Sequence, residues 1–127
     1  MRYVVLIHSN PQPWGHPTID FTAEGRGVPA DRRAADGAAF EAFLSELSAR
    51  DELVAAEALA EPASSTLWRW SDGAPATTDG PYTEAAEHLA GFFLLDVATP
   101  ERAHEVARQF AGPGDTIELR PAYVWPS

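Results

Sequence analysis

Phe92-Phe93-Leu94-Leu95-Asp96-Val97, followed by Ala98-Thr99-Pro100-Glu101, is the stretch that decides the fold. Its first part is almost entirely apolar, which is typical of a strand at the centre of a sheet. Its second part has the form of a helix start, with Thr99 as N-cap, Pro100 at the first helical position and Glu101 favouring the helix dipole. Residues 112–114, Gly-Pro-Gly, end that helix, and the alternation over 116–120 predicts a strand.

The first half of the chain repeats this strand–helix–strand order. Residues 3–7 form a continuous apolar run, which predicts another central strand. Residues 31–50 predict a helix, because their large apolar side chains fall at positions i, i+3, i+4 and i+7, namely Phe40, Phe43, Leu44 and Leu47. Residues 53–59 predict a further strand, which carries Glu57.

Residues 9–30 are predicted to form a long loop, since three prolines and a glycine lie between positions 11 and 17. Loops of this length tend to be lids, binding loops or disordered segments. Asp31 or Asp36 is available to cap the helix that follows. Because Gly37 weakens the early part of that helix, we expect its ordered part to begin near Asp36.

The middle of the chain predicts a β-hairpin. Apolar and polar residues alternate over 66–70, residues 71–73 form a turn, and 74–78 continue as the second arm. Pro75 restricts this second arm to a sheet edge. Residues 82–89 predict at most a short helix.

We therefore predict one α+β domain over residues 1–127, a ferredoxin-like split βαβ sheet with an extra β-hairpin. Two helices cover only one face of a four-stranded sheet, yet residues 3–7 and 92–97 are apolar on both faces. A homodimer through the sheet faces would cover the second face. Burying about 800 Å² per chain, at about 25 cal/mol/Å², would give roughly 20 kcal/mol before association costs.

Composition excludes several classes of function. The net charge of −10 comes from 19 acidic residues against nine arginines, with no lysine, and such a balance disfavours nucleic acid. No cysteine is present, which removes thiol catalysis and thiolate metal sites. No apolar run approaches the roughly 20 residues of a membrane span, so a soluble cytoplasmic protein is expected. The common cofactor motifs are absent from the sequence, and no cofactor or metal is predicted.

Asp79-Gly80-Pro81-Tyr82, followed by Thr83-Glu84-Ala85-Ala86-Glu87-His88, is the stretch richest in chemistry. Gly80 supplies backbone freedom and Pro81 fixes φ, which predicts a rigid bend that holds nearby side chains in place. At helical spacing Glu84 and His88 would be neighbours, an arrangement compatible with a metal or with a weak surface contact. No third ligand has a recognisable spacing.

The chain resembles the DGPF branch of the YCII-related proteins, with Tyr82 where that family usually has Phe. The likeness covers nearly the whole chain, through residues 1–8, 53–59, 78–82, 91–96 and 118–121. It implies a dimeric α/β barrel related to the ferredoxin-like fold. The family has no established reaction, and its DGPF members are often encoded beside extracytoplasmic-function sigma factors.

Three residues are candidates for acid–base catalysis. His8 ends the first strand, Glu57 lies within an alanine-rich strand, and Asp79 opens the bend. An imidazole can act as a general base, and a carboxylate facing a barrel interior would have its pKa raised by desolvation. The alternatives are a strand end satisfied by backbone for His8, solvent exposure for Glu57, and capping of its own turn for Asp79.

Four further residues are candidates for substrate binding: Tyr82, Arg120, Glu84 and Trp14. Our first hypothesis places His8, Glu57, Asp79, Tyr82 and Arg120 around one small-molecule pocket between the sheet and its helices. The second hypothesis is a non-enzymatic dimer that acts through protein contacts, for example in a sigma-factor-linked stress or transcription pathway. Convergence of His8 with Glu57 or Asp79 in one concave pocket would favour the first.

Overall fold

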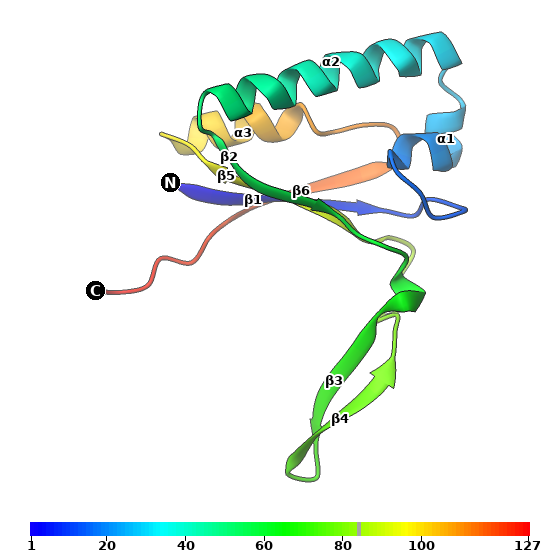
Figure 1. Cartoon of the computed structure of the whole chain (residues 1–127), viewed down its shortest axis with the longest axis vertical. Helices are drawn as coiled ribbons and strands as arrows, with labels where there is room; N and C mark the ends of the chain where they lie inside the picture. Colours follow the sequence, from blue (N-terminus) through cyan, green and yellow to red (C-terminus); the bar gives the residue numbers. More distant parts are fainter. Residues whose placement is uncertain (84) are drawn as a thin grey trace.

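The computed structural model describes residues 1–83 and 85–127, and its centre is a four-stranded antiparallel sheet. The strands are β1 (Arg2–Ser9), β2 (Leu53–Ala58), β5 (His88–Asp96) and β6 (Asp115–Pro121), in the order β2-β5-β1-β6. Helices α2 (Ala30–Ala49) and α3 (Pro100–Arg108) both lie on one face of this sheet (Figure 1). The architecture is α+β and compatible with a ferredoxin-like fold. The two apolar runs of the sequence are its central strands, as predicted.

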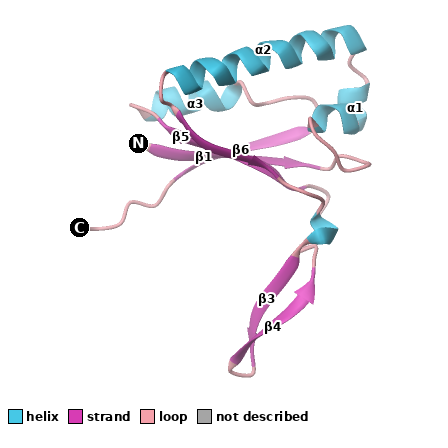
Figure 2. Ribbon diagram, in the orientation of Figure 1, coloured by secondary structure: helices cyan, strands magenta, loops and turns pink. Residues whose placement is uncertain are grey.

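The hydrophobic core lies between the sheet and the two helices (Figure 2). Val5 of β1, Leu95 of β5 and Leu47 of α2 are fully buried there. Phe110, just after α3, packs against the rings of Phe93, Phe40 and Phe43. Alternate residues of each strand supply this core, so the residues between them point to the opposite face of the sheet.

The two helices begin in different ways. Thr99 caps α3 as predicted, since its hydroxyl accepts a hydrogen bond from the backbone N–H of Arg102 at 3.1 Å. Helix α2 begins at Ala30, so the expected start near Asp36 is wrong. The many alanines around Gly37 have the highest helix propensity, which offsets the cost of one glycine.

The segment between β1 and α2 is more regular than predicted. It contains a 3₁₀ turn, η1 (Thr18–Phe21), and a short helix, α1 (Ala23–Arg26). The hydroxyl of Thr22 caps α1 by accepting a hydrogen bond from the N–H of Gly25 at 3.0 Å. The prediction of an unbroken loop over 9–30 is therefore wrong, because capping and tertiary contacts order its second half.

The predicted β-hairpin is confirmed, as strands β3 (Thr66–Ser71) and β4 (Ala74–Asp79), after the 3₁₀ turn η2 (Pro62–Ser64). It forms a separate two-stranded sheet, and it projects from the body on the side opposite the helices (Figure 1). The short helix expected after it is wrong for the described residues 82, 83 and 85–87. Pairing of β5 with β1 already begins at His88, so the last two residues of the expected helix belong to a strand.

Within the described residues, no helix combines the length and the apolar character that crossing a bilayer requires.

Candidate functional site

The sheet face without helices, here called the open face, brings together candidate residues from three strands. Directly paired residues of antiparallel strands share a face. Leu6 of β1 pairs with Phe92 of β5 and with Glu118 of β6, and Val4 pairs with Leu94 and Arg120. His8 pairs with Thr116 of β6. An apolar centre is therefore flanked by ionisable side chains along β6.

His8 and Glu118 form the closest polar contact on the open face. Nε2 of His8 lies 2.9 Å from Oε1 of Glu118, and about a third of each side chain is exposed, 31% and 33% respectively. Since an ionised carboxylate only accepts hydrogen bonds, Nε2 carries the proton in this contact. When this imidazole is neutral, its lone pair is therefore at Nδ1, and the neutral form is the one in which a histidine acts as a base.

Arg120 completes the arrangement from the next residue on the same face of β6. One of its guanidinium nitrogens donates to Oε2, the second carboxylate oxygen of Glu118. The hydrogen bond with His8, followed by the hydrogen bond from Arg120, lowers the pKa of Glu118 below its ordinary value. The carboxylate therefore stays ionised at neutral pH and orients the imidazole.

Glu57 lies on the edge strand β2, directly opposite Phe92. The register puts its side chain on the open face, and the side chain is exposed. No hydrogen bond joins it to His8 within the described residues. The open face therefore carries His8, Glu57 and Arg120, with Glu118 between His8 and Arg120. Glu57 is separate from them, because β5 lies between β2 and β1.

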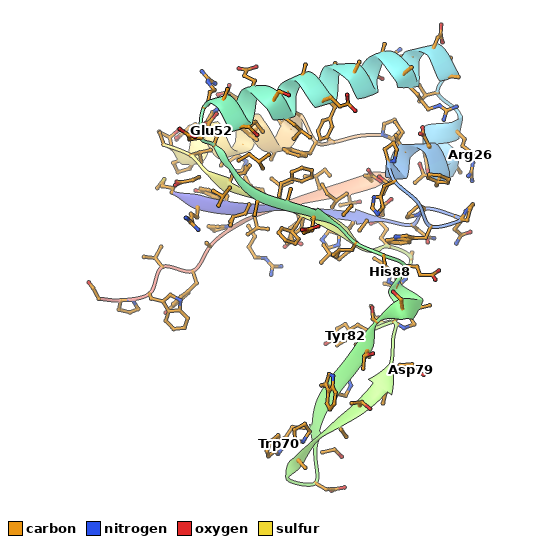
Figure 3. The ribbon with its side chains drawn as sticks, in the orientation of Figure 1. Arg26, Glu52, Trp70, Asp79, Tyr82 and His88 are labelled. Carbon is orange, nitrogen blue, oxygen red and sulfur yellow. The ribbon has the colours of Figure 1, made fainter. Side chains whose placement is uncertain are left out.

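Asp79 and Tyr82 lie at the base of the hairpin (Figure 3), whereas His8 lies on β1 of the main sheet. The backbone N–H of Gly80 donates to the carbonyl of Ser65 at 2.7 Å, so the Asp-Gly-Pro-Tyr bend closes the hairpin. A Cβ on Gly80 would lie 2.6 Å from the Cβ of Ser65, which explains the glycine. The Tyr82 ring is 74% exposed and stacks beneath the guanidinium of Arg69 at 5.5 Å.

Trp14 has a structural contact. Its indole Nε1 donates to the carbonyl of Leu59 at 2.9 Å, and Nε2 of His16 donates to the same oxygen at 2.8 Å. These two bonds fasten the segment after β1 to the end of β2. Glu84, the remaining substrate-binding candidate, lies outside the described residues.

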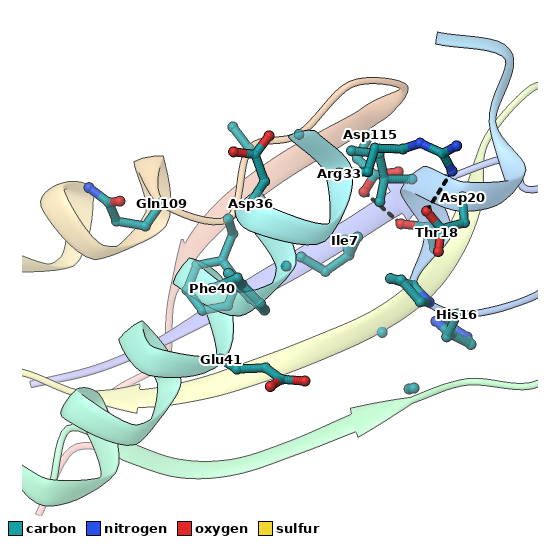
Figure 4. Close-up of a pocket in the computed structure, with 18 of the residues that line it drawn as sticks. Ile7, His16, Thr18, Asp20, Arg33, Asp36, Phe40, Glu41, Gln109 and Asp115 are labelled. Atoms are coloured by element: carbon teal, nitrogen blue, oxygen red, sulfur yellow. Dashed lines mark hydrogen bonds and ion pairs between the residues drawn. The ribbon is translucent and has the colours of Figure 1, made fainter. Parts of the chain in front are cut away.

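A cavity of about 1030 Å³ lies on the other side of the sheet, beneath the N-terminal half of α2 (Figure 4). Small residues such as Gly37 leave this space open, and Phe40, Phe93 and Phe110 form its apolar wall. At one end Arg33 pairs with Asp20 at 2.9 Å, and the Thr18 hydroxyl donates to Asp115 at 2.7 Å.

The expectation that one pocket between sheet and helices gathers the five candidates is wrong. Of those five, only Glu57 borders this cavity, at the β2 edge. His8 and Arg120 face away from it, because odd-numbered β1 residues such as Val5 supply the core and even-numbered ones the open face.

Sequence reasoning missed two residues of interest. Glu118 was seen only as part of an alternating strand, and its contact with His8 depends on the register between strands 110 residues apart. One carboxylate oxygen of Asp115 is buried and has no hydrogen-bond partner among the described residues. The same is true of the hydroxyl of Ser9, which lies opposite Asp115 on β1. The described residues contain no cluster of His, Asp and Glu suited to hold a metal ion.

Comparison with known proteins identifies the family. The family model of the YCII-related domain matches residues 1–125, almost the entire chain. The chain belongs to the YCII-related family. A search of curated proteins gave no match to this YCII-related protein. The family assignment agrees with the resemblance seen in the sequence, and the DGPF branch within it remains a prediction.

Proposed function

We propose that this YCII-related protein is a homodimer of the DGPF type, in which two open faces enclose a small-molecule site with acid–base chemistry. The hydrogen bond between His8 and Glu118 carries the proposal, because it fixes an imidazole tautomer next to an apolar surface. The paired faces would form the dimeric α/β barrel that the resemblance implies.

The open face has the composition of an interface. Its centre consists of Val4, Leu6, Phe92 and Leu94, all only half-buried in the single subunit. The exposed C-terminal aromatics Tyr123 and Trp125 stack edge to face at 4.9 Å, and the tail that carries them extends on the helix-free side (Figure 1). A partner subunit packed on this side would remove the apolar centre from water.

The chemistry of the site follows from the three side chains in contact. His8 takes a proton from the substrate at Nδ1, while Glu118 stabilises the imidazolium that forms. Arg120 holds Glu118 in place and offers positive charge to a developing anion. Glu57 is a second carboxylate on the same face. Within one subunit Asp79, Tyr82 and Trp14 lie on other elements, so they take no part in this proton transfer.

The oligomeric state tests the dimer. Leu6→Asp places a charge at the centre of the open face, and we expect a monomer at micromolar concentration by size-exclusion chromatography with light scattering. Ala35→Asp on the exposed surface of α2 is the matched control and should remain dimeric. A monomeric wild-type protein would refute the proposal.

Deuterium exchange tests the proton transfer. Simple 1,3-dicarbonyl compounds have acidic C–H groups, and their exchange in D₂O is followed by NMR. We expect the protein to accelerate exchange, and His8→Ala to lose about 100-fold or more of that acceleration. Equal rates for the two proteins would reject His8 as the base.

A second candidate function is the non-enzymatic dimeric accessory protein in a sigma-factor-linked stress or transcription pathway. The observation that favours it is the separation of His8 from Asp79, which lie on the main sheet and on the hairpin. A wild-type dimer that accelerates no exchange would support this alternative.

A further inference from the structure

The β3–β4 hairpin has one aromatic face that none of the described residues of its own subunit covers. Trp68 and Trp70 stand two residues apart on β3, so both point to the same side of the ribbon. They are 69% and 75% exposed. Their cross-strand partners are Thr77 and Pro75, so this face holds no charged side chain between the base and the turn.

The other face of the hairpin differs in character. Arg69 points there, and its guanidinium lies over the ring of Tyr82. The ribbon is therefore two-sided: Arg69 contacts Tyr82 at the base from one face, and the other face presents the two exposed tryptophans. A two-stranded hairpin in water is marginally stable by itself, and exposed adjacent tryptophans mark an interaction surface.

The position of the hairpin indicates what covers it. Figure 3 shows the strand that carries Trp70 extending away from the sheet on the helix-free side, where the open face also lies. The hairpin leaves the sheet between β2 and β5, and His8 pairs with Leu89 at that same end of the sheet. A protein partner that packs on the open face therefore contacts both the hairpin and the surroundings of His8.

The dimensions suit a second copy of the chain. Packed sheets lie about 10 Å apart, and a six-residue strand spans roughly 20 Å, so the hairpin reaches past the gap and alongside the partner's sheet. Burying two tryptophans would add about 300–500 Å² of interface area per subunit. Added to about 800 Å² of sheet face, this total is in the range of obligate homodimers.

We propose that each subunit's hairpin clasps the other subunit through Trp68 and Trp70, and closes the His8 end of the space between the two sheets. This inference rests on the proposed homodimer, and it makes the site incomplete in a single chain. The partner is a second copy of this protein. Trp68 and Trp70 anchor the hairpin on that copy and form one wall of the site.

Photo-crosslinking tests this arrangement directly. Trp70 is replaced by p-benzoylphenylalanine, and irradiation is expected to give a covalent dimer whose crosslink maps to the partner's sheet or C-terminal tail. The same amino acid in place of Ala35 on α2 is the control, and should give no covalent dimer. If position 70 gives crosslinks within one chain and none between chains, the inference is overturned.

The double variant Trp68→Ser/Trp70→Ser provides a second measurement. We expect its dimer dissociation constant to rise by at least 100-fold in sedimentation equilibrium, whereas Ala76→Ser on the other hairpin face leaves it unchanged. A wild-type dimer that neither crosslinks at position 70 nor weakens in the double variant would overturn the clasp and leave sheet pairing intact. A monomeric wild type would overturn both.

Discussion

Nε2 of His8 and Oε1 of Glu118 lie 2.9 Å apart, although 110 positions separate the two residues along the chain. They stand on neighbouring strands, β1 and β6, and Arg120 holds the far oxygen of the same carboxylate. The contact gives the histidine a defined orientation on a surface whose centre is apolar.

Glu118→Gln tests how the carboxylate controls the imidazole. An amide side chain can donate as well as accept, so the preference for the proton on Nε2 should weaken. We expect ¹⁵N NMR of His8 near neutral pH to show mainly the Nε2-protonated tautomer in the wild type and a more even mixture in the variant. Arg120→Gln should leave the Nε2 tautomer dominant, and loss of that preference there would contradict the direct role of Glu118.

A second ion pair, between Glu52 and Arg102, predicts the pH dependence of stability. Nε of Arg102 donates to Oε2 of Glu52 at 2.9 Å and Nη2 donates to Oε1 at 2.8 Å, and both side chains are largely buried. The hydrogen bonds from Arg102 lower the pKa of Glu52 below its ordinary 4.5. The stabilisation is therefore complete above the unfolded-state pKa and is lost as pH falls through the lower folded-state pKa.

Glu52→Gln should accordingly reduce the free energy of unfolding by about 1–2 kcal/mol at pH 7. The difference from the wild type should shrink as the pH falls below 4.5, in urea titrations at each pH. Glu41→Gln, at an exposed position of α2, makes the same charge change at a residue with no ion pair among the described residues. A constant difference across this pH range would contradict the role of the Glu52–Arg102 pair.

Phe110 joins three elements of the core. Its ring lies 4.5 Å from the ring of Phe93 and 5.3 Å from that of Phe40, measured between centroids, and only 7% of the residue is exposed. Phe110→Ala should cost about 3–5 kcal/mol of unfolding free energy. Phe110→Leu, which keeps most of the volume, should cost less than half as much, and equal costs would refute packing as the cause.

Two glycines predict opposite effects of the same substitution. A Cβ on Gly37 meets nothing within 4 Å, whereas one on Gly80 would lie 2.8 Å from the carbonyl oxygen of Pro62. Gly37→Ala should stabilise the protein by about 0.5–1 kcal/mol through helix propensity. Gly80→Ala should open the base of the hairpin, seen as faster amide exchange at the β3–β4 pairs.

Several elements could be predicted because short-range patterns encode them. Thr99-Pro100-Glu101 begins α3, and residues 3–7 and 92–97 are the central strands as expected. The start of α2 and the helical turns at Thr18–Phe21 and Ala23–Arg26 were missed. Their order depends on contacts with distant residues, such as the hydrogen bond from Thr18 to Asp115, 97 positions away.

The candidate site shows the same division. The sequence placed His8 at a strand end and Arg120 in an alternating strand, and the structure puts both on the open face. The sequence also placed Asp79 and Tyr82 in a bend, and in the structure this bend closes the hairpin. The hydrogen bond between His8 and Glu118 escaped prediction, because no local pattern specifies the register that brings residues of two distant strands together.

By itself, the sequence determined the strands of the main sheet and of the hairpin, the two long helices, and that two helices leave one sheet face uncovered, since side-chain periodicity and capping act over a few residues. Tertiary structure decided which side chains share that face, that a carboxylate from β6 orients His8, and that the cavity lies on the opposite side. Those outcomes follow from strand register, where a shift of one residue would exchange the two faces.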